Sequence, residues 1–203
     1  MVNIASTEKI ARRREDILQA AITVFADKGY HSASIADMAA ILQIGHGTIY
    51  RYYKNKKALF DAVINSILQN LATVVQDEPP TTDSLLEYKG QIVRISDRLI
   101  AIFQTDRRIA RIALYETIDG NNDAADRVTA SFSLFARFIQ EYMRNGVEKG
   151  FLRKNMDQEI AARIVTSMIF ETVKAATVEE SSELLIARWR DEIIQIMIGG
   201  LGA

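Results

Sequence analysis

Cysteine is absent from this 203-residue chain, and proline occurs only twice, at adjacent positions 79 and 80. Without cysteine the chain can form no disulfide bond and can use no thiolate chemistry. No apolar run approaches the ~18 residues that a membrane-spanning helix needs. The N-terminal run MVNIASTEKIARRRE also lacks the apolar segment of a signal peptide. These features predict a cytoplasmic protein with no membrane partner.

Catalytic motifs are missing as well. The chain has only two histidines, His31 and His46, and it contains no H-E-x-x-H, P-loop or G-x-S-x-G sequence. Carboxylates are plentiful, but their spacing marks no catalytic pair. We therefore expect no enzyme activity, no catalytic residue, no metal site and no cofactor, although an enzyme remains the alternative from a different class of protein.

The charged residues are distributed unevenly along the chain, although the net charge is only −1. Residues 1–60 hold nine Lys or Arg against five Asp or Glu, a net charge of +4. The remainder holds 16 basic against 21 acidic residues, a net charge of −5. A basic first segment joined to an acidic body is the distribution expected if only the first segment contacts a polyanion.

Helical periodicity dominates the chain, and no alternating strand pattern or internal repeat occurs, so the predicted fold class is all-α. The interruption at Asp77–Asp83 and several Gly or Asn positions divide the sequence into about nine helices. We predict an N-terminal three-helix DNA-binding domain over residues 1–55 and a helical domain over 56–203. The expected helices are 8–28, 35–42, 46–53, 56–75, 84–104, 107–118, 124–149, 157–176 and 182–198.

Residues 34–60 are the most informative segment. Ser34 can cap a helix whose apolar face is formed by residues 35, 38, 39 and 42. The turn at 43–45 follows, where Gly45 is expected to relax the backbone. In the next helix, Ile49 and Tyr53 are four residues apart and should point inward. Two short helices joined by a tight turn are typical of a helix-turn-helix that presents its second helix to duplex DNA.

The outer side of this second helix is the predicted base-reading surface. On a helical wheel Gly47, Thr48 and Arg51 lie outward, with Tyr50 on a flank and His46 nearer the buried edge, beside Tyr52. Arg51 can form a bidentate pair with guanine. The predicted base-reading residues are His46, Gly47, Thr48, Tyr50 and Arg51, and the predicted phosphate contacts are Ser34, Tyr52, Lys56 and Arg13.

At these residues the chain resembles a known family. The run GTIYRYY at 47–53, followed by KNKKAL at 54–59, resembles the signature of the TetR family of bacterial repressors. Two positions depart from that pattern: Gln43 stands where the family usually has glycine, and Gly45 where it usually has a capping serine or threonine. The resemblance implies about nine helices, a homodimer, a palindromic operator in double-stranded DNA, and a small-molecule effector.

The last two helices are apolar on more than one face, which favours either deep burial or a second interface. The resemblance implies that they pair with a second copy of the chain, whereas an ordinary core is the alternative from the pattern alone. The predicted interface residues are Ile164, Met168, Trp189, Ile193 and Met197.

Many aromatic residues lie in the middle of the body. A packed core explains most of them, but a cavity for a small ligand would use the same residue types. The resemblance implies an inducer pocket here, for which the predicted residues are Phe103, Tyr115, Glu116, Phe135, Phe138, Met168 and Phe170. Their character favours an apolar or amphipathic effector.

The sequence thus predicts a ligand-responsive DNA-binding transcriptional regulator, most simply a homodimeric repressor that an effector releases from a palindromic operator. The alternative is a DNA-binding regulator or activator that has no small-molecule effector.

Overall fold

The structure is a computed structural model that describes residues 4–118, 122–178 and 183–201. These residues form nine α-helices and no strand, so the all-α prediction is confirmed for the described part of the chain. The helices are α1 (Ile4–Ser32), α2 (Ile35–Leu42), α3 (His46–Tyr50), α4 (Lys56–Gln76), α5 (Leu85–Thr105), α6 (Arg107–Ile118), α7 (Asn122–Lys149), α8 (Gln158–Val178) and α9 (Glu183–Leu201).

Several helix boundaries differ from the predicted ones, and two of these differences bear on the head. The third helix ends at Tyr50 rather than Tyr53, and residues 51–52 form a turn. The first helix continues to Ser32, with Gly29 in a non-helical conformation inside it (φ 72°, ψ 170°). Glycine tolerates that positive φ because it has no Cβ, so the regular helix ends where Gly29 predicted and a short turn follows.

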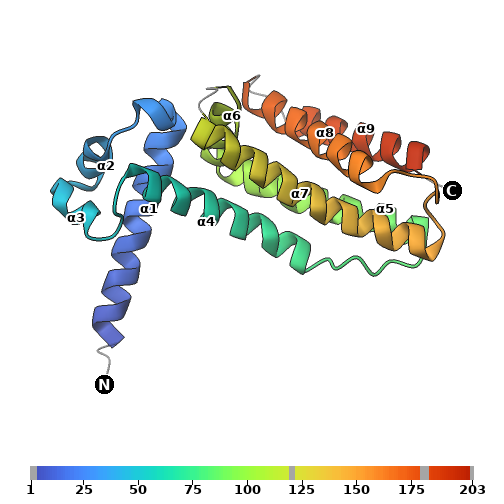
Figure 1. Cartoon of the computed structure of the whole chain (residues 1–203), viewed down its shortest axis with the longest axis horizontal. Coiled ribbons are helices and arrows are strands. Elements are labelled where there is room, and N and C mark those ends of the chain that lie inside the picture. The colour runs from blue at the N-terminus through green and yellow to red at the C-terminus, as the bar shows by residue number, and fades with distance from the viewer. Residues whose placement is uncertain (1–3, 119–121, 179–182, 202–203) are drawn as a thin grey trace.

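The helices form two lobes (Figure 1). α1, α2 and α3 make the smaller lobe, here called the head. α4 leads from it along one edge of the larger lobe, the body, where α5, α7, α8 and α9 run side by side. α6 packs against α1 and therefore joins the body to the head.

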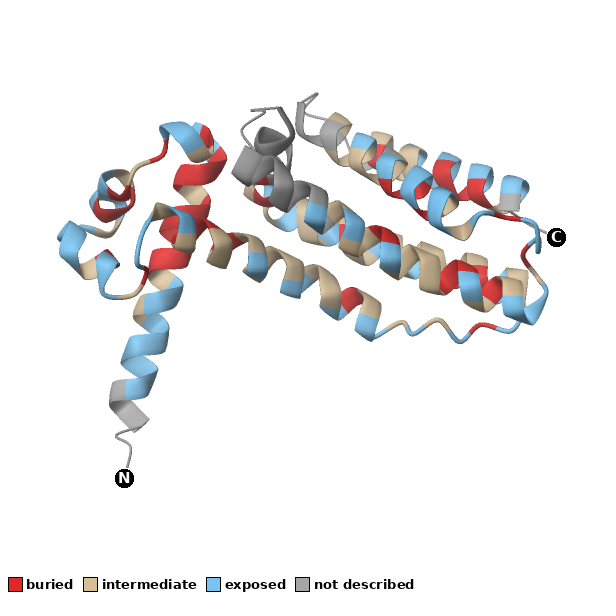
Figure 2. Ribbon diagram, viewed as in Figure 1, coloured by how far each residue is buried: buried red, intermediate tan, exposed pale blue. Residues whose placement is uncertain are grey.

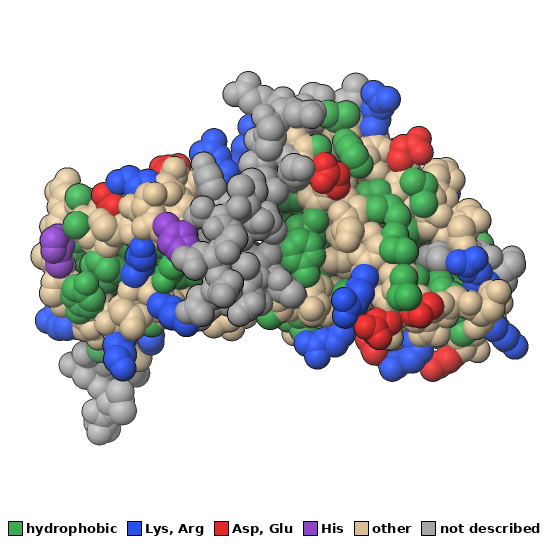
Figure 3. All heavy atoms as spheres, turned by 45° about the horizontal axis from the view of Figure 1, so that its top comes forward, with side chains coloured by type: hydrophobic (Ala, Val, Ile, Leu, Met, Phe, Trp, Pro, Cys, Tyr) green, Lys and Arg blue, Asp and Glu red, His purple; other side chains and the backbone are tan. Residues whose placement is uncertain are grey.

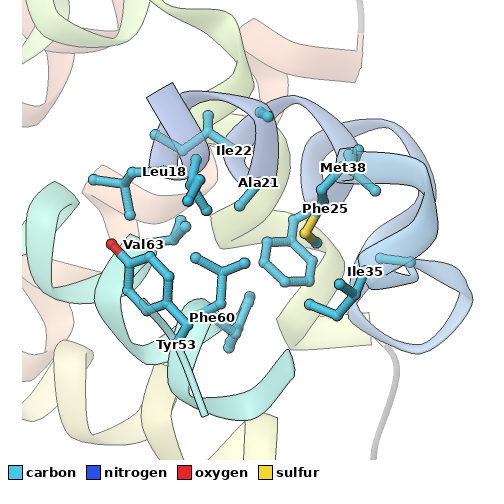
Figure 4. Packing of buried hydrophobic residues seen from close by; sticks show 14 of the residues in the cluster. Leu18, Ala21, Ile22, Phe25, Ile35, Met38, Tyr53, Phe60 and Val63 are labelled. Atoms are coloured by element: carbon cyan, nitrogen blue, oxygen red, sulfur yellow. The ribbon is translucent and has the colours of Figure 1, made fainter. Parts of the chain in front are cut away.

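The head has a dense apolar core, to which α1, α2 and α4 contribute side chains (Figure 4). The Phe25 ring meets the Phe60 ring edge to face at a centroid distance of 5.0 Å, and Tyr30 lies 4.9 Å from Phe60. Such aromatic pairs add about 0.5–1.5 kcal/mol to the gain from burial alone. Met38 and Ile49 are also fully buried, so both helices of the helix-turn-helix are anchored in this core.

A second apolar cluster fills the body, and α4 contributes to both clusters (Figure 2). Leu59, Phe60 and Val63 belong to the head core, whereas Val75 packs in the body. The division of the chain at residues 55 and 56 therefore stays a prediction.

α4 is the one helix among the described residues that is long and apolar enough to cross a membrane, with a mean hydropathy of 1.4 over its most apolar window. Packing accounts for this composition. Its first turns enter the head core, and Ile64, Ile67, Leu68 and Leu71 line a cavity in the body.

The turn between α2 and α3 corrects one expectation. Gln43, not Gly45, adopts the left-handed conformation (φ 53°), and its backbone N–H caps α2 by donating to the carbonyls of Ala39 and Ala40. Gly45 has an ordinary extended conformation (φ −71°), and a Cβ added there would meet nothing within 4 Å. The left-handed position of this turn is therefore occupied by glutamine and not by glycine.

Replacing Gln43 with glycine should stabilise the head, because the left-handed region costs an L-residue roughly 1 kcal/mol more than glycine. We expect the free energy of unfolding to rise by about 1 kcal/mol in denaturant titrations. The matched control, Gly45→Ala at the N-cap of α3, should not raise the stability, because alanine is a poorer N-cap than glycine. A fall in stability for Gln43→Gly would contradict the assigned turn.

Candidate nucleic-acid interface and body cavity

α3 is fixed at one position and exposed around it. Ile49 is fully buried in the head core, and Tyr53 just beyond the helix is buried as well. Four of the predicted base-reading residues are exposed to solvent: His46, Gly47, Tyr50 and Arg51. The fifth, Thr48, is half-buried. The wheel placed His46 too near the buried edge, because α3 begins at that residue and its side chain lies at the exposed corner.

A reciprocal capping box fixes the start of α2. The Ser34 hydroxyl accepts a hydrogen bond from the Asp37 backbone N–H (3.2 Å) and donates to the Asp37 carboxylate (2.8 Å). The Ser34 backbone N–H also donates to that carboxylate (3.0 Å). Lys28 donates to it from α1 at 2.7 Å. These bonds, first that from Lys28, lower the Asp37 pKa to about 2, so the carboxylate stays charged at neutral pH.

In this arrangement the Asp37 carboxylate competes with a DNA phosphate for the Ser34 hydroxyl group. The hydroxyl hydrogen of Ser34 is already committed to the Asp37 carboxylate. A phosphate bound at Ser34 would have to share a site with a negative charge, which electrostatics disfavours. The capping role of Ser34 fits the sequence expectation that it starts this helix.

Lys56 has a role that the sequence did not suggest. Its ammonium group donates to the carbonyls of Tyr30 (2.7 Å), His31 (3.1 Å) and Ala33 (2.9 Å), and lies 4.6 Å from the centre of the Tyr30 ring. All three N–H donors of the ammonium are therefore used. Lys56 caps the C-terminal end of α1, where a cation complements the helix dipole. A phosphate at Lys56 would compete with these carbonyls, and the predicted phosphate contact stays a prediction.

The other two predicted phosphate contacts, Arg13 and Tyr52, are both partly exposed on the head. Arg13, on α1, is 3.7 Å from Asp16 in an exposed ion pair that constrains it weakly. Tyr52 is half-buried against the head core. The neighbouring Arg14 guanidinium lies 5.5 Å from the centre of the Tyr53 ring. Figure 3 shows the histidines and several Lys and Arg side chains on the surface of the head.

The body contains two adjoining cavities. Cavity A, about 120 Å³, lies among α5, α7, α8 and α9, and cavity B, about 90 Å³, extends to α4 and α6. The two share part of their lining: Leu99, Phe103, Phe135, Ile169 and Val173. Every lining residue of cavity B is apolar, and the lining of cavity A adds five residues with polar groups: Ser96, Thr172, Tyr88, Tyr142 and Arg190.

Most of the predicted pocket residues line these cavities. Phe103 and Phe135 line both, Phe138 lines cavity A and Phe170 lines cavity B. Met168 lines neither and packs at the edge of the body core, which corrects that prediction. Tyr115 and Glu116 lie in the stretch 113–129, whose side chains are outside the described residues. The sequence missed the cavity lining from α9 and, apart from Phe103, that from α5, because ordinary apolar periodicity hides it.

The outer face of α8 and α9 carries exposed apolar side chains. Ile160 and Ile164 on α8 and Ile196 on α9 are 57%, 51% and 56% exposed. In Figure 3, which turns the top of Figure 1 toward the viewer, apolar side chains form a strip on the body bordered by charged ones. Two predicted interface residues need correction, because Ile193 and Met197 are buried in the body core of the same chain.

Arg108 at the start of α6 connects the body to the head. Its guanidinium pairs with Asp106 at 2.7 Å and donates to Thr23 (2.8 Å) and Gln19 (3.1 Å), both on α1. Four residues later, Ile112 belongs to the head core and also lines cavity B. The wall of the cavity and the core of the head therefore share a side chain.

An exposed short helix, anchored from behind and preceded by a capped partner helix, defines a helix-turn-helix DNA-binding protein. Comparison with known proteins identifies its kind. Residues 17–63 match the sequence model for bacterial regulatory proteins of the tetR family. The resemblance to the TetR family is thus confirmed for the helix-turn-helix segment, and the chain is a DNA-binding transcriptional regulator.

Relatives match along nearly the whole chain. The fatty acid metabolism regulator protein of Bacillus subtilis is 19% identical over 91% of this chain and 93% of its own length. The transcriptional repressor KstR2 of Mycolicibacterium smegmatis is 24% identical over 94% and 91%. These relatives are named as regulators or repressors of transcription.

Solved structures share the fold. The fatty acid degradation regulator FadR from Bacillus halodurans superposes with a TM-score of 0.78 at 20% identity, covering 92% of this chain and 98% of the other. FadR from Bacillus subtilis, solved in complex with stearoyl-CoA, gives a TM-score of 0.74 at 17% identity with the same coverage.

Replacing Lys56 with glutamine should destabilise the head, because three carbonyls at the end of α1 lose a charged donor. We expect a loss of about 2 kcal/mol in the free energy of unfolding, against almost none for the exposed control Lys54→Gln. The salt dependence of DNA binding separates the two roles. A slope unchanged by Lys56→Gln supports capping, whereas a slope reduced by about one restores the phosphate contact.

Proposed function

We propose that the protein is a homodimeric repressor that binds a palindromic operator and is released by an apolar or amphipathic effector. The observation that carries the DNA-binding part is the exposure of His46, Gly47, Tyr50 and Arg51 around a helix anchored by Ile49. The alternative, a regulator or activator without an effector, differs only in the body, where the two cavities favour the ligand-responsive form.

The exposed side of α3 suits the major groove of DNA. Arg51 offers two parallel N–H donors to guanine O6 and N7, and Tyr50 and Thr48 can contact thymine methyl groups or phosphates. A Cβ added at Gly47 would meet nothing within 4 Å of the protein itself. The chain therefore has no internal need for glycine there, and close approach to a base pair explains it. Tyr52 and Arg13 would contact the flanking phosphates.

A two-fold dimer supplies the contact area that one five-residue helix lacks. The exposed Ile160, Ile164 and Ile196 form the surface that a second copy would cover through α8 and α9. Trp189 lies seven residues before Ile196 on α9, which is two turns of the same helix. A two-fold interface uses the same patch on both subunits and sets two reading helices on successive turns of the duplex. A palindromic operator follows from that symmetry.

The effector would occupy the cavities. Their apolar lining suits an aliphatic chain, and relatives that share this fold include a fatty acid metabolism regulator and a FadR structure holding stearoyl-CoA. An occupant of cavity B would touch Ile112, which packs in the head core, next to the Arg108 bonds to α1. The ligand releases DNA only if it binds more tightly to the released head position.

Arg51 provides the sharpest test of base reading. Operator DNA comes from selection of bound genomic fragments by the purified protein. Arg51→Ala should weaken operator binding by roughly tenfold to a hundredfold, as expected for loss of a bidentate base contact, with a smaller effect on random DNA. The control is Arg153→Ala, an exposed body residue. Equal losses on both DNAs would make Arg51 a phosphate contact, and no loss would remove α3 from the groove.

Ile164 tests the dimer. Ile164→Glu places a charge on the proposed interface and should weaken self-association by about tenfold or more, the usual scale for a central apolar contact. The control, Leu86→Glu on α5, changes an even more exposed apolar residue (81%) outside that surface. Sedimentation equilibrium measures both. An unaltered dimer constant for Ile164→Glu would place the interface elsewhere.

A further inference from the structure

Arg190 is the only charged side chain among the described residues that line the two cavities. It lies on α9 and is half-buried, with 22% of its side chain exposed. Charged groups in apolar surroundings are costly unless they are paired. The cavity therefore contains one feature whose chemistry is specific enough to select a ligand.

The partners of Arg190 are two exposed carboxylates that do not belong to the cavity lining. Its guanidinium pairs with Asp97 on α5, and its Nε and a terminal nitrogen contact Asp191 at 2.8 and 2.7 Å. Asp97 is half exposed, Asp191 more so, and neither lines a cavity. These carboxylates raise the pKa of the guanidinium further, so it is always charged. Arg190 thus belongs to the cavity lining, whereas neither of its carboxylate partners does.

The other polar groups lining cavity A are weaker candidates for recognition. The Thr172 hydroxyl donates to the Met168 carbonyl of its own helix (3.0 Å), and the Tyr142 hydroxyl donates to the Glu78 carbonyl. Both have partners within the protein and lack a charge. Arg190 can instead exchange one carboxylate for another without leaving a buried charge unpaired.

We infer that Arg190 binds the anionic head group of a linear acyl ligand, which displaces Asp97 from the guanidinium. This assignment rests on the proposed effector function and names the class of its ligand. The tail lies in cavity A and continues past Phe103 and Phe135 into cavity B, whose lining is entirely apolar. The order of groups along the ligand, acid first and alkyl chain after, follows the order of groups along the cavities.

The exchange also links the ligand to the packing of the body. The Arg190–Asp97 pair joins α9 to α5. A ligand anion that takes the place of Asp97 removes this link between the two helices. Removing the Asp97 charge should therefore favour the ligand, because the anion no longer competes with an internal carboxylate.

The test measures binding to the full-length protein by titration calorimetry with three sixteen-carbon probes below their aggregation limits: hexadecanoate, hexadecanoyl-CoA and the uncharged hexadecan-1-ol. Arg190→Gln should weaken binding of the charged probes by about tenfold or more, the scale of a lost charge-assisted hydrogen bond, and leave the alcohol unchanged. The control Arg144→Gln, an exposed residue on α7, should change nothing. The free acid and the thioester distinguish a carboxylate from the phosphates of the coenzyme as the bound anion.

Asp97→Asn gives an independent reading that does not depend on how Arg190→Gln folds. It should raise the affinity for the charged probes relative to the alcohol. Equal losses for acid and alcohol with Arg190→Gln, or no gain with Asp97→Asn, would overturn the assignment. If the alcohol binds the wild-type protein and neither charged probe does, the head-group assignment fails and the effector proposal stands. If no probe binds, both fail, while operator binding by the head is unaffected.

Discussion

A helix of five residues has no stability of its own in water, because helix nucleation costs more than so few hydrogen bonds return. α3 exists because Ile49 is fully buried in the head core and Gln43 closes the preceding turn. Because Ile49 holds the inner side of α3 in the core, the remaining residues of α3 can be exposed. The position of Ile49 therefore determines which residues are available to contact DNA. The capping of α2 by Ser34 and of α1 by Lys56 serves the same end by fixing the helices behind it.

The head and the body are coupled through side chains that belong to both. Ile112 packs in the head core and lines cavity B, and Arg108 beside it bonds to α1. We propose that a change in the filling of the cavity reaches the head through this packed side chain and these hydrogen bonds. Such coupling is a difference in ligand affinity between two head positions, and the apolar lining of the cavities gives the ligand surface from which that difference can arise.

The helices and the anchor of α3 could be predicted from the sequence, because apolar periodicity and capping residues are local signals. The capping box of Ser34 with Asp37 and the burial of Ile49 and Tyr53 follow from spacing alone. The contacts that the sequence did not suggest join residues distant in the chain. Lys56 meets carbonyls more than twenty residues earlier, and a helix start rich in lysine gives no sign of that.

Burial on the last helix shows the same limit. Ile193 and Met197 carry the same apolar character as the exposed Ile196, yet they face the body core. A helix that is apolar on several sides does not reveal from its own sequence which side faces its own chain and which faces a partner. Arg190 was likewise indistinguishable from other surface cations until the cavity gave it a context.

The account depends most on α3 entering the DNA. Hydrogen exchange of the full-length protein, measured with and without its selected operator, tests this directly. We expect the strongest protection at the backbone amides of residues 45–52, with random DNA giving less. Protection confined to the body, or absent from this segment while the operator is bound, would contradict the account.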